Sequence, residues 1–346
     1  SKPEDGLAIA RMLGHITYLS NESMDKKFGK DKLKPRDIKT DFEKKFSVGT
    51  YLAYQGSKFV ERFDANSYLT LTTAMDLFSI GENKKEIEKS LKATESEWLF
   101  ISFSSDWLYP PEQSKELVDA LISSEKTVSY TNIPSKAGHD AFLLEDELED
   151  YGNLTAAFLN KLKGEHTKNI HSSKLSTREK TNIFYNKRLD LNIVADLVPK
   201  NSSVLDLGCE DGDLLSLLRD KGCSELIGIE IDYKKVETCA KKGLTVINYD
   251  IEKGLKSFSN KKFDIAILSQ TLQAIKNVEE IIIEMTKVAK ASIISFPNFA
   301  YKPLREMMFK EGKAPRIEGW YGYEWYNTPN KRFPSIADFE NFCDLK

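Results

Sequence analysis

Apolar residues in the N-terminal part of the chain recur every three or four positions, which is the spacing of an amphipathic helix. The strict apolar–polar alternation of a half-buried strand does not occur there. The pattern therefore predicts a helical segment over residues 7–82. The positions that define the spacing are Leu7, Ala10, Met12, Leu13, Ile16, Tyr51, Leu52, Phe59, Tyr68, Leu71 and Met75.

The pattern changes over residues 95–162. A buried strand is predicted at 98–103, a helix at 112–124 and a second strand at 127–133, followed by a helix that ends near Leu162. Strands that alternate with helices in this way form a parallel sheet. Residues 1–163 are therefore predicted to form one α/β domain that carries the helical segment.

Residues 164–182 are polar, carry charges of both signs and have almost no large apolar side chains, which is typical of a solvated linker. Beyond it, strand and helix patterns alternate again, so a second, doubly wound sheet is predicted over residues 183–346. Its predicted strands lie at 203–208, 225–231, 245–249, 263–269 and 291–296.

Length and composition agree with two domains and exclude several classes of protein. The chain has 346 residues, more than one core usually fills, and is 40% hydrophobic and 30% charged, as globular proteins are. Fifty basic and 53 acidic residues give a net charge of −3, too balanced for a nucleic-acid-binding surface. Neither a membrane-spanning run nor a signal peptide is present in the sequence, so we expect a cytoplasmic protein.

Two further features concern the cysteines and the chain ends. The four cysteines form no CxxC pair and the histidines do not cluster, so neither a disulfide framework nor a metal site is predicted. The chain begins with Ser1 rather than Met, and residues 335–346 break off within a helical pattern. We therefore expect a fragment of a longer protein.

Asp106 and His139 each follow the carboxyl end of a predicted strand, and loops at that edge of a parallel sheet converge. A carboxylate that accepts the Nδ1 proton of an imidazole leaves Nε2 free to act as base and acid toward a nucleophilic hydroxyl. In the α/β-hydrolase triad, the acid and the histidine follow the serine along the chain. The sequence contains no Gly-x-Ser-x-Gly, so the serine is expected upstream of residue 1. The plainer alternative is a turn aspartate and a surface histidine.

The residues around this pair resemble the homoserine O-acyltransferase family (MetX) over most of residues 1–162. The motifs that carry the resemblance are Gly6-Leu-Ala-Ile-Ala-Arg-Met12, His15-Ile-Thr-Tyr18, the segment 54–68, Ser104-Ser-Asp-Trp-Leu-Tyr-Pro-Pro-Glu-Gln-Ser114 and Gly138-His-Asp-Ala-Phe142. The resemblance implies the C-terminal part of an α/β-hydrolase fold with a helical lid. It also implies acyl transfer from an acyl-CoA to L-homoserine in methionine biosynthesis, and a homodimer through the lid.

The same resemblance assigns residues to roles. Asp106 and His139 would be catalytic, Arg11 would bind the substrate carboxylate, and Asp140 would bind its ammonium group. A helix-surface cation and a helix N-cap are the plainer interpretations of Arg11 and Asp140. Family members that resemble succinyltransferases have an arginine where this chain has Leu108, which favours acetyl-CoA over succinyl-CoA as the donor.

A glycine loop, Asp206-Leu-Gly-Cys-Glu-Asp-Gly212, follows the first strand of the second sheet. Glycines in such a loop let the backbone approach a ligand, and an acid at the end of the next strand binds ribose hydroxyls. Asp206, Gly208, Gly212, Glu230 and Asp250 fit a Rossmann-like class I methyltransferase site for S-adenosylmethionine. The alternative is a loop that serves only as a turn of the fold.

Further motifs extend this match to a resemblance with the MetW family over residues 183–346. They are Val204-Leu-Asp-Leu-Gly-Cys209, Ile229-Glu-Ile-Asp232, Leu268-Ser-Gln-Thr-Leu-Gln-Ala274, Ser295-Phe-Pro-Asn-Phe299 and Tyr326-Asn-Thr-Pro-Asn330. Glu210 stands where that family usually has glycine. Its side chain and charge crowd the place of the ligand's carboxylate, which puts S-adenosylmethionine binding in doubt.

Three hypotheses follow. The first is a homoserine O-acetyltransferase fused to a MetW-like domain that contacts it within one chain. The second is an S-adenosylmethionine-dependent methyltransferase with a relic N-terminal part. The third is a non-catalytic MetW-like domain that regulates the acyltransferase through contact.

Overall fold

The computed structural model describes residues 3–29, 47–164, 189–259, 262–314 and 326–346. The chain forms two compact units, of which the first comprises Ser1–Lys126 and Tyr130–Asn153 and the second comprises Thr127–Ser129 and Leu154–Lys346. The predicted linker at 164–182 lies, from residue 165 onward, outside the described residues. The domain boundary therefore stays a prediction. In the described part of the chain, no helix has both the length and the apolar character needed to cross a bilayer.

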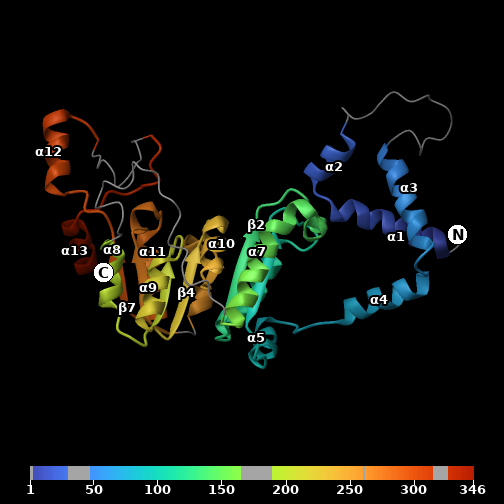
Figure 1. Ribbon diagram of the computed structural model, residues 1–346, viewed down its shortest axis with the longest axis horizontal. Helices are drawn as coiled ribbons and strands as arrows, with labels where there is room; N and C mark the ends of the chain where they lie inside the picture. Colours follow the sequence, from blue (N-terminus) through green and yellow to red (C-terminus); the bar gives the residue numbers. More distant parts are fainter. Residues whose placement is uncertain (1–2, 30–46, 165–188, 260–261, 315–325) are drawn as a thin grey trace. The chain divides into compact units, whose positions relative to one another are not determined.

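The N-terminal part of the first unit is helical, as the apolar spacing predicts (Figure 1). Residues 30–46 of the predicted helical segment lie outside the described residues. Asp64 begins α4 because its carboxylate accepts hydrogen bonds from the backbone N–H groups of Asn66 and Ser67. The helices are α1 (Pro3–Tyr18), α2 (Asn21–Phe28), α3 (Ser47–Val60), α4 (Ala65–Leu77) and α5 (Lys84–Lys92).

Two adjacent strands, β1 (Trp98–Phe103) and β2 (Val128–Ile133), follow in the first part of the chain. The helix α6 (Pro111–Ser123) connects them, and it begins at a proline whose missing N–H costs nothing at that position. A short 3₁₀ helix, His139–Leu143, and the helix α7 (Glu145–Leu162) come after β2. This order places the loops after β1 and β2 at one edge of the strand pair.

The second unit contains a parallel sheet with the strand order β5-β4-β3-β6-β7. The first strand along the chain, β3, lies in the middle, so the strand order reverses between β3 and β6, where doubly wound sheets bind ligands. Its elements are α8 (Leu189–Leu197), β3 (Ser203–Leu207), α9 (Asp213–Lys221), β4 (Glu225–Glu230), α10 (Tyr233–Lys241), β5 (Thr245–Asn248), β6 (Phe263–Ser269), α11 (Val278–Val288), β7 (Ala289–Ser295), α12 (Lys302–Glu311) and α13 (Ile336–Leu345).

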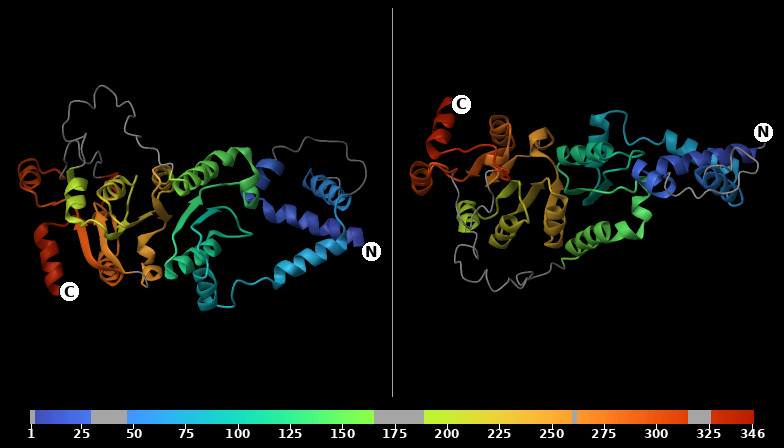
Figure 2. Two further views of the ribbon diagram at one scale, coloured as in Figure 1. Left: turned by 60° about the horizontal axis from the view of Figure 1, so that its bottom comes forward. Right: turned by 90° about the horizontal axis from the view of Figure 1, so that it is seen from above.

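Helices cover the two faces of this sheet (Figure 2). One apolar cluster joins α8 and α9 to β3 and β6, and a second joins α9 to α10, so these three helices share a face. The other face is packed by α11 through buried residues such as Ile281 and Met285. Because helices cover both faces of the sheet, its strands carry apolar side chains on both faces. The prediction of an α/β fold with a doubly wound parallel sheet is confirmed.

Candidate functional site

Asp106 and His139 are in contact at the edge of the first strand pair. The imidazole Nδ1 of His139 lies 2.9 Å from Oδ2 of Asp106. The other carboxylate oxygen accepts hydrogen bonds from the backbone N–H groups of Leu108 and Tyr109, at 3.0 and 2.9 Å. One carboxylate thus fixes both its own turn and the imidazole ring, which leaves Nε2 for another partner.

The backbone around His139 requires glycine at position 138. Gly138 has a φ of +82°, and a Cβ built there would lie 2.4 Å from the backbone nitrogen of Ser20. Gly138 and Leu19 form an antiparallel bridge, and the Trp107 Nε1 donates to the Leu19 carbonyl at 3.2 Å. The end of α1 and the loops after both strands are therefore joined around the histidine.

Aromatic side chains surround the His139 ring. The rings of Tyr18, Tyr109 and Phe142 have centroids 5.5, 5.2 and 5.6 Å from that of His139. The His139 side chain is 22% exposed. The ring is thus held in place, yet a ligand can still approach it.

Among the described residues, no contact joins Arg11 to Asp140. The charges of both residues nevertheless affect the pKa of His15. The Arg11 guanidinium lies over the Phe59 ring, 5.1 Å from its centroid. Burial lowers the pKa of His15, the Arg11 charge lowers it further, and the Asp140 charge opposes them. Asp140 directly follows His139 in the 3₁₀ helix. Gly138, not Asp140, is the N-cap of that helix, so the plainer interpretation of Asp140 does not hold.

The glycine loop of the second unit folds through three residues in the left-handed region. Gly208 and Gly212 have φ values of +78° and +74°, and a Cβ on either would lie 2.6 Å or less from a neighbouring side chain. Glu210 has a φ of +49°, which a residue with a Cβ adopts at a cost of roughly 1–2 kcal/mol. The backbone conformation at 210 is therefore one that suits glycine.

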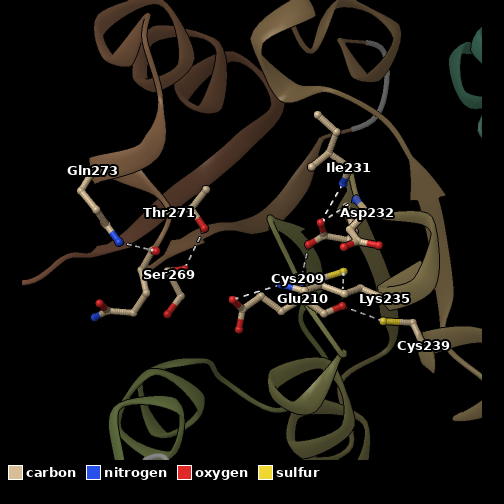
Figure 3. Close-up of polar contacts among 11 residues, drawn as sticks. Cys209, Glu210, Ile231, Asp232, Lys235, Cys239, Ser269, Thr271 and Gln273 are labelled. Carbon is tan, nitrogen blue, oxygen red and sulfur yellow. Dashed lines mark hydrogen bonds and ion pairs between the residues drawn. The ribbon is translucent and has the colours of Figure 1, made fainter. Parts of the chain in front are cut away.

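Contacts within the chain hold Glu210 in this conformation (Figure 3). Its carboxylate lies 3.5 Å from the Lys235 Nζ, and its carbonyl accepts a hydrogen bond from the buried Cys239 thiol at 3.1 Å. A hydrogen bond with Cys239 and burial raise the pKa of the neighbouring Cys209 thiol well above its usual value. The Cys209 thiol is thus not a ready nucleophile.

Glu230 ends β4 at the predicted place, but its carboxylate already has partners. Oε1 accepts from the backbone N–H groups of Ile231 and Asp232, each at 2.9 Å, and Oε2 accepts from the Glu210 N–H at 2.9 Å. Three of roughly four acceptor positions are therefore used. Asp250 caps a short 3₁₀ helix by accepting from the Glu252 N–H at 3.0 Å.

Asp206 is the most deeply buried acid of the loop, with 2% of its surface exposed. Burial, together with the charges of Glu230 and Glu210, raises its pKa to about 7. The cavity beside it has a volume of about 90 Å³ and is lined by four acidic residues, Asp206, Glu210, Asp211 and Asp213. Ligand sites usually measure roughly 300–1,000 Å³. The cavity is smaller than this range, and four of its lining side chains are acidic.

No group of three or more histidine, cysteine, aspartate or glutamate side chains that could hold a metal occurs among the described residues.

Residues 188–346 match the family model described as methionine biosynthesis protein MetW. This part of the chain is a MetW domain. The matched residues include the glycine loop, residues 206–212.

The remainder of the chain is similar to acyltransferases of homoserine. A bifunctional methionine biosynthesis protein MetXA/MetW of Rhodopirellula baltica is 44% identical over 345 residues, which is 97% of this chain and 53% of the relative. A homoserine O-acetyltransferase of Methanohalobium evestigatum is 38% identical over 270 residues, or 77% of this chain and 52% of the relative. A homoserine O-succinyltransferase of Cupriavidus taiwanensis is 45% identical over 162 residues, or 46% of this chain and 40% of the relative. The chain thus spans about half the length of the relatives it matches, or less.

Two residues next to the candidate sites were not predicted from the sequence. His15 lies in a motif that carries the resemblance, and its spacing of four residues from Arg11 could have placed both on one face of α1. Lys235 pairs with Glu210 from the next helix, α10, and no local pattern indicates that contact.

Proposed function

We propose that this chain belongs to an enzyme that transfers an acetyl group from acetyl-CoA to the hydroxyl of L-homoserine. The observation that carries the proposal is the 2.9 Å contact between His139 Nδ1 and Asp106 Oδ2. In this reaction, Asp106 holds the imidazole so that Nε2 takes a proton from a serine hydroxyl and returns it to the departing thiolate. The serine is expected from the part of the relatives that this chain does not span.

The second half of the reaction uses the same imidazole. The hydroxyl of L-homoserine gives its proton to His139 Nε2 while its oxygen attacks the acyl-serine carbonyl, and the proton then returns to the serine oxygen. Arg11 would bind the carboxylate of L-homoserine and Asp140 its ammonium group. The position of Asp140, directly after His139, supports this assignment.

The proposed donor is acetyl-CoA. Leu108, which follows the Asp106-Trp107 pair, is apolar and gives the second carboxylate of a succinyl group no partner. Its backbone N–H is already bonded to Asp106, so the residue lies beside the proposed catalytic pair. Succinyl-CoA is the alternative donor, since relatives named for either donor match the chain.

The test is acyl transfer by the complete protein as its gene encodes it, with acetyl-CoA and succinyl-CoA compared. We expect O-acetyl-L-homoserine to be the main product. His139→Ala removes the base, so its kcat should fall at least about 10³-fold. A thermal unfolding midpoint close to that of wild type is the control for folding. A variant that retains turnover would refute the role of His139.

For the MetW domain we propose a non-catalytic role exerted by contact with the acyltransferase part. The small acidic cavity and the occupied carboxylate of Glu230 support this over methyl transfer. Isothermal titration calorimetry with S-adenosylmethionine at up to about 1 mM should detect no binding. The binding free energy would then be weaker than about −4 kcal/mol, which corresponds to a Kd of about 1 mM. Glu210→Gly is the matched variant. If this variant binds S-adenosylmethionine and the wild type does not, Glu210 is the residue that prevents binding. Tight binding by wild type would favour the methyltransferase alternative.

We also propose a homodimer formed through the helical lid. The helix α4 has no buried residue, and Leu69, Leu71, Met75 and Leu77 are all more than half exposed. Apolar residues grouped on a helix in this way are typical of a protein–protein contact.

A further inference from the structure

His15 is buried in α1, yet one of its ring nitrogens lacks a partner. The residue is 9% exposed, and no described residue hydrogen-bonds to its Nε2. A buried polar atom is nearly always paired with protein, water or a ligand. Among the described residues, the unpartnered Nε2 is thus a place where a ligand atom would be stabilised.

The other ring nitrogen fixes the direction of this unpartnered atom. The hydroxyl of Tyr51 in α3 lies 3.1 Å from His15 Nδ1, and the two rings meet edge to face with centroids 5.5 Å apart. Tyr51 is held in turn by Phe28, at 5.2 Å between centroids, and by the Lys27 Nζ, 4.0 Å from its ring. The His15 ring therefore cannot turn freely to find another partner.

The charges around His15 determine its protonation. Burial is the main cause that lowers its pKa, and the charges of Arg11 and Lys27 act in the same direction against that of Asp140. The imidazole is therefore neutral near pH 7 and carries one N–H. When the Tyr51 hydroxyl donates to Nδ1, that N–H is on Nε2 and points away from Tyr51.

His15 belongs to the same part of the molecule as the proposed catalytic pair. Arg11 lies one turn before it and Tyr18 one turn after it in α1, and Tyr18 packs on His139. The bridge between Leu19 and Gly138 ties the end of this helix to the loop that carries His139 and Asp140. Arg11 thus lies in the same helix as His15, and the charge of Asp140 acts on the His15 ring.

We propose that His15 is a third substrate-binding residue, whose Nε2–H donates a hydrogen bond to the α-carboxylate of the amino-acid substrate beside Arg11. The proposal rests on the proposed acyl transfer to L-homoserine. A donor N–H selects the carboxylate rather than the ammonium group, because an ammonium group offers only donors. Asp140 would bind the ammonium group. Arg11 and His15 would then bind the carboxylate of the same amino acid.

The test compares two isosteric substitutions in the complete protein. The side-chain amide of His15→Gln reaches the position of Nε2, whereas that of His15→Asn reaches the position of Nδ1 and keeps only the contact with Tyr51. We expect His15→Asn to raise the KM for L-homoserine about 10- to 100-fold, as expected for a lost bond to a charged group. His15→Gln should stay within about fivefold of wild type. The KM for acetyl-CoA should change less than about twofold in both.

Tyr51→Phe is the control for a structural role, because it removes the partner of Nδ1 and leaves Nε2 in place. If His15 served only to pack α1 on α3, His15→Asn and Tyr51→Phe would both leave the KM for L-homoserine unchanged, and His15→Gln would be the variant with the lower unfolding midpoint. That result would overturn the proposal.

A second measurement does not depend on turnover. In ¹⁵N-histidine spectra, the Nε2 signal of His15, identified by its absence in His15→Gln, should shift with L-homoserine and not with L-homoserinol, which lacks the carboxylate. No shift in a protein that does catalyse acyl transfer would overturn the inference and leave the proposed function intact. An inactive wild-type protein whose Nε2 signal still shifts would instead contradict the proposed function alone.

Discussion

At the scale of single residues, Asp206 shows most clearly how the fold controls a charge. Its carboxyl group is buried in the middle of the MetW sheet beside two other acids, and its pKa is raised from 3.8 to about 7. A raised pKa means that the folded state holds the proton more tightly than the unfolded state does. The protonated side chain thus stabilises the fold fully below pH 3.8, and this contribution is lost as the pH rises through 7.

The prediction concerns Asp206→Asn, which keeps the shape and removes the charge. Between pH 5 and pH 8 the free energy of unfolding of the wild-type protein should fall by about 2–3 kcal/mol through this group, whereas that of the variant should change less. Urea unfolding at the two pH values measures both. Asp220→Asn, in an exposed side chain, is the control. Equal pH slopes for wild type and Asp206→Asn would contradict the assigned pKa.

Sequence alone could predict the residue pairs that follow from topology but not those that depend on backbone direction. Asp106 and His139 were expected to meet because both follow strands of one parallel pair, and they lie 2.9 Å apart. The carboxylate of Glu230 was expected to face a ligand. It binds the N–H groups of Glu210, Ile231 and Asp232 instead, because the loop turns these groups toward it. Only coordinates show such a turn.

At the scale of elements, the strands were predicted within one residue of their observed ends, except β7, which begins two residues earlier than predicted, at Ala289. Apolar runs bounded by charged or glycine residues mark buried strands well. The contact of α1 with the loop after β2 had no comparable signal. It depends on Gly138, whose backbone approaches that of Ser20 too closely for any side chain.

Gly138→Ala should therefore disturb the joint between α1 and the His139 loop. A Cβ would lie 2.4 Å from the Ser20 nitrogen and 2.7 Å from the Tyr18 carbonyl oxygen, and the φ of +82° disfavours alanine. We expect a loss of about 2–3 kcal/mol in the free energy of unfolding. Gly6→Ala in α1, where the added Cβ meets no atom within 4 Å, should instead be neutral or stabilising by up to about 1 kcal/mol. Chemical denaturation of both variants tests this contrast.

At the scale of the whole molecule, the chain joins two parts with separate chemistry. The acyltransferase-like part has an acid–histidine pair with a partly exposed ring, whereas the MetW domain has a loop whose carboxylates are paired or buried. Joining the two in one chain raises their effective concentration for one another. The proposed role of the MetW domain, contact with the acyltransferase part, needs this proximity.

The most direct test of the account is the rate of acetyl transfer to L-homoserine by the complete protein with Asp106→Asn. The amide oxygen can still accept from Leu108 and Tyr109, while the amide NH₂ meets His139 Nδ1 and forces the wrong tautomer. We expect kcat to fall about 10³- to 10⁴-fold, with the KM for L-homoserine nearly unchanged. A variant with more than about a tenth of wild-type kcat would contradict it.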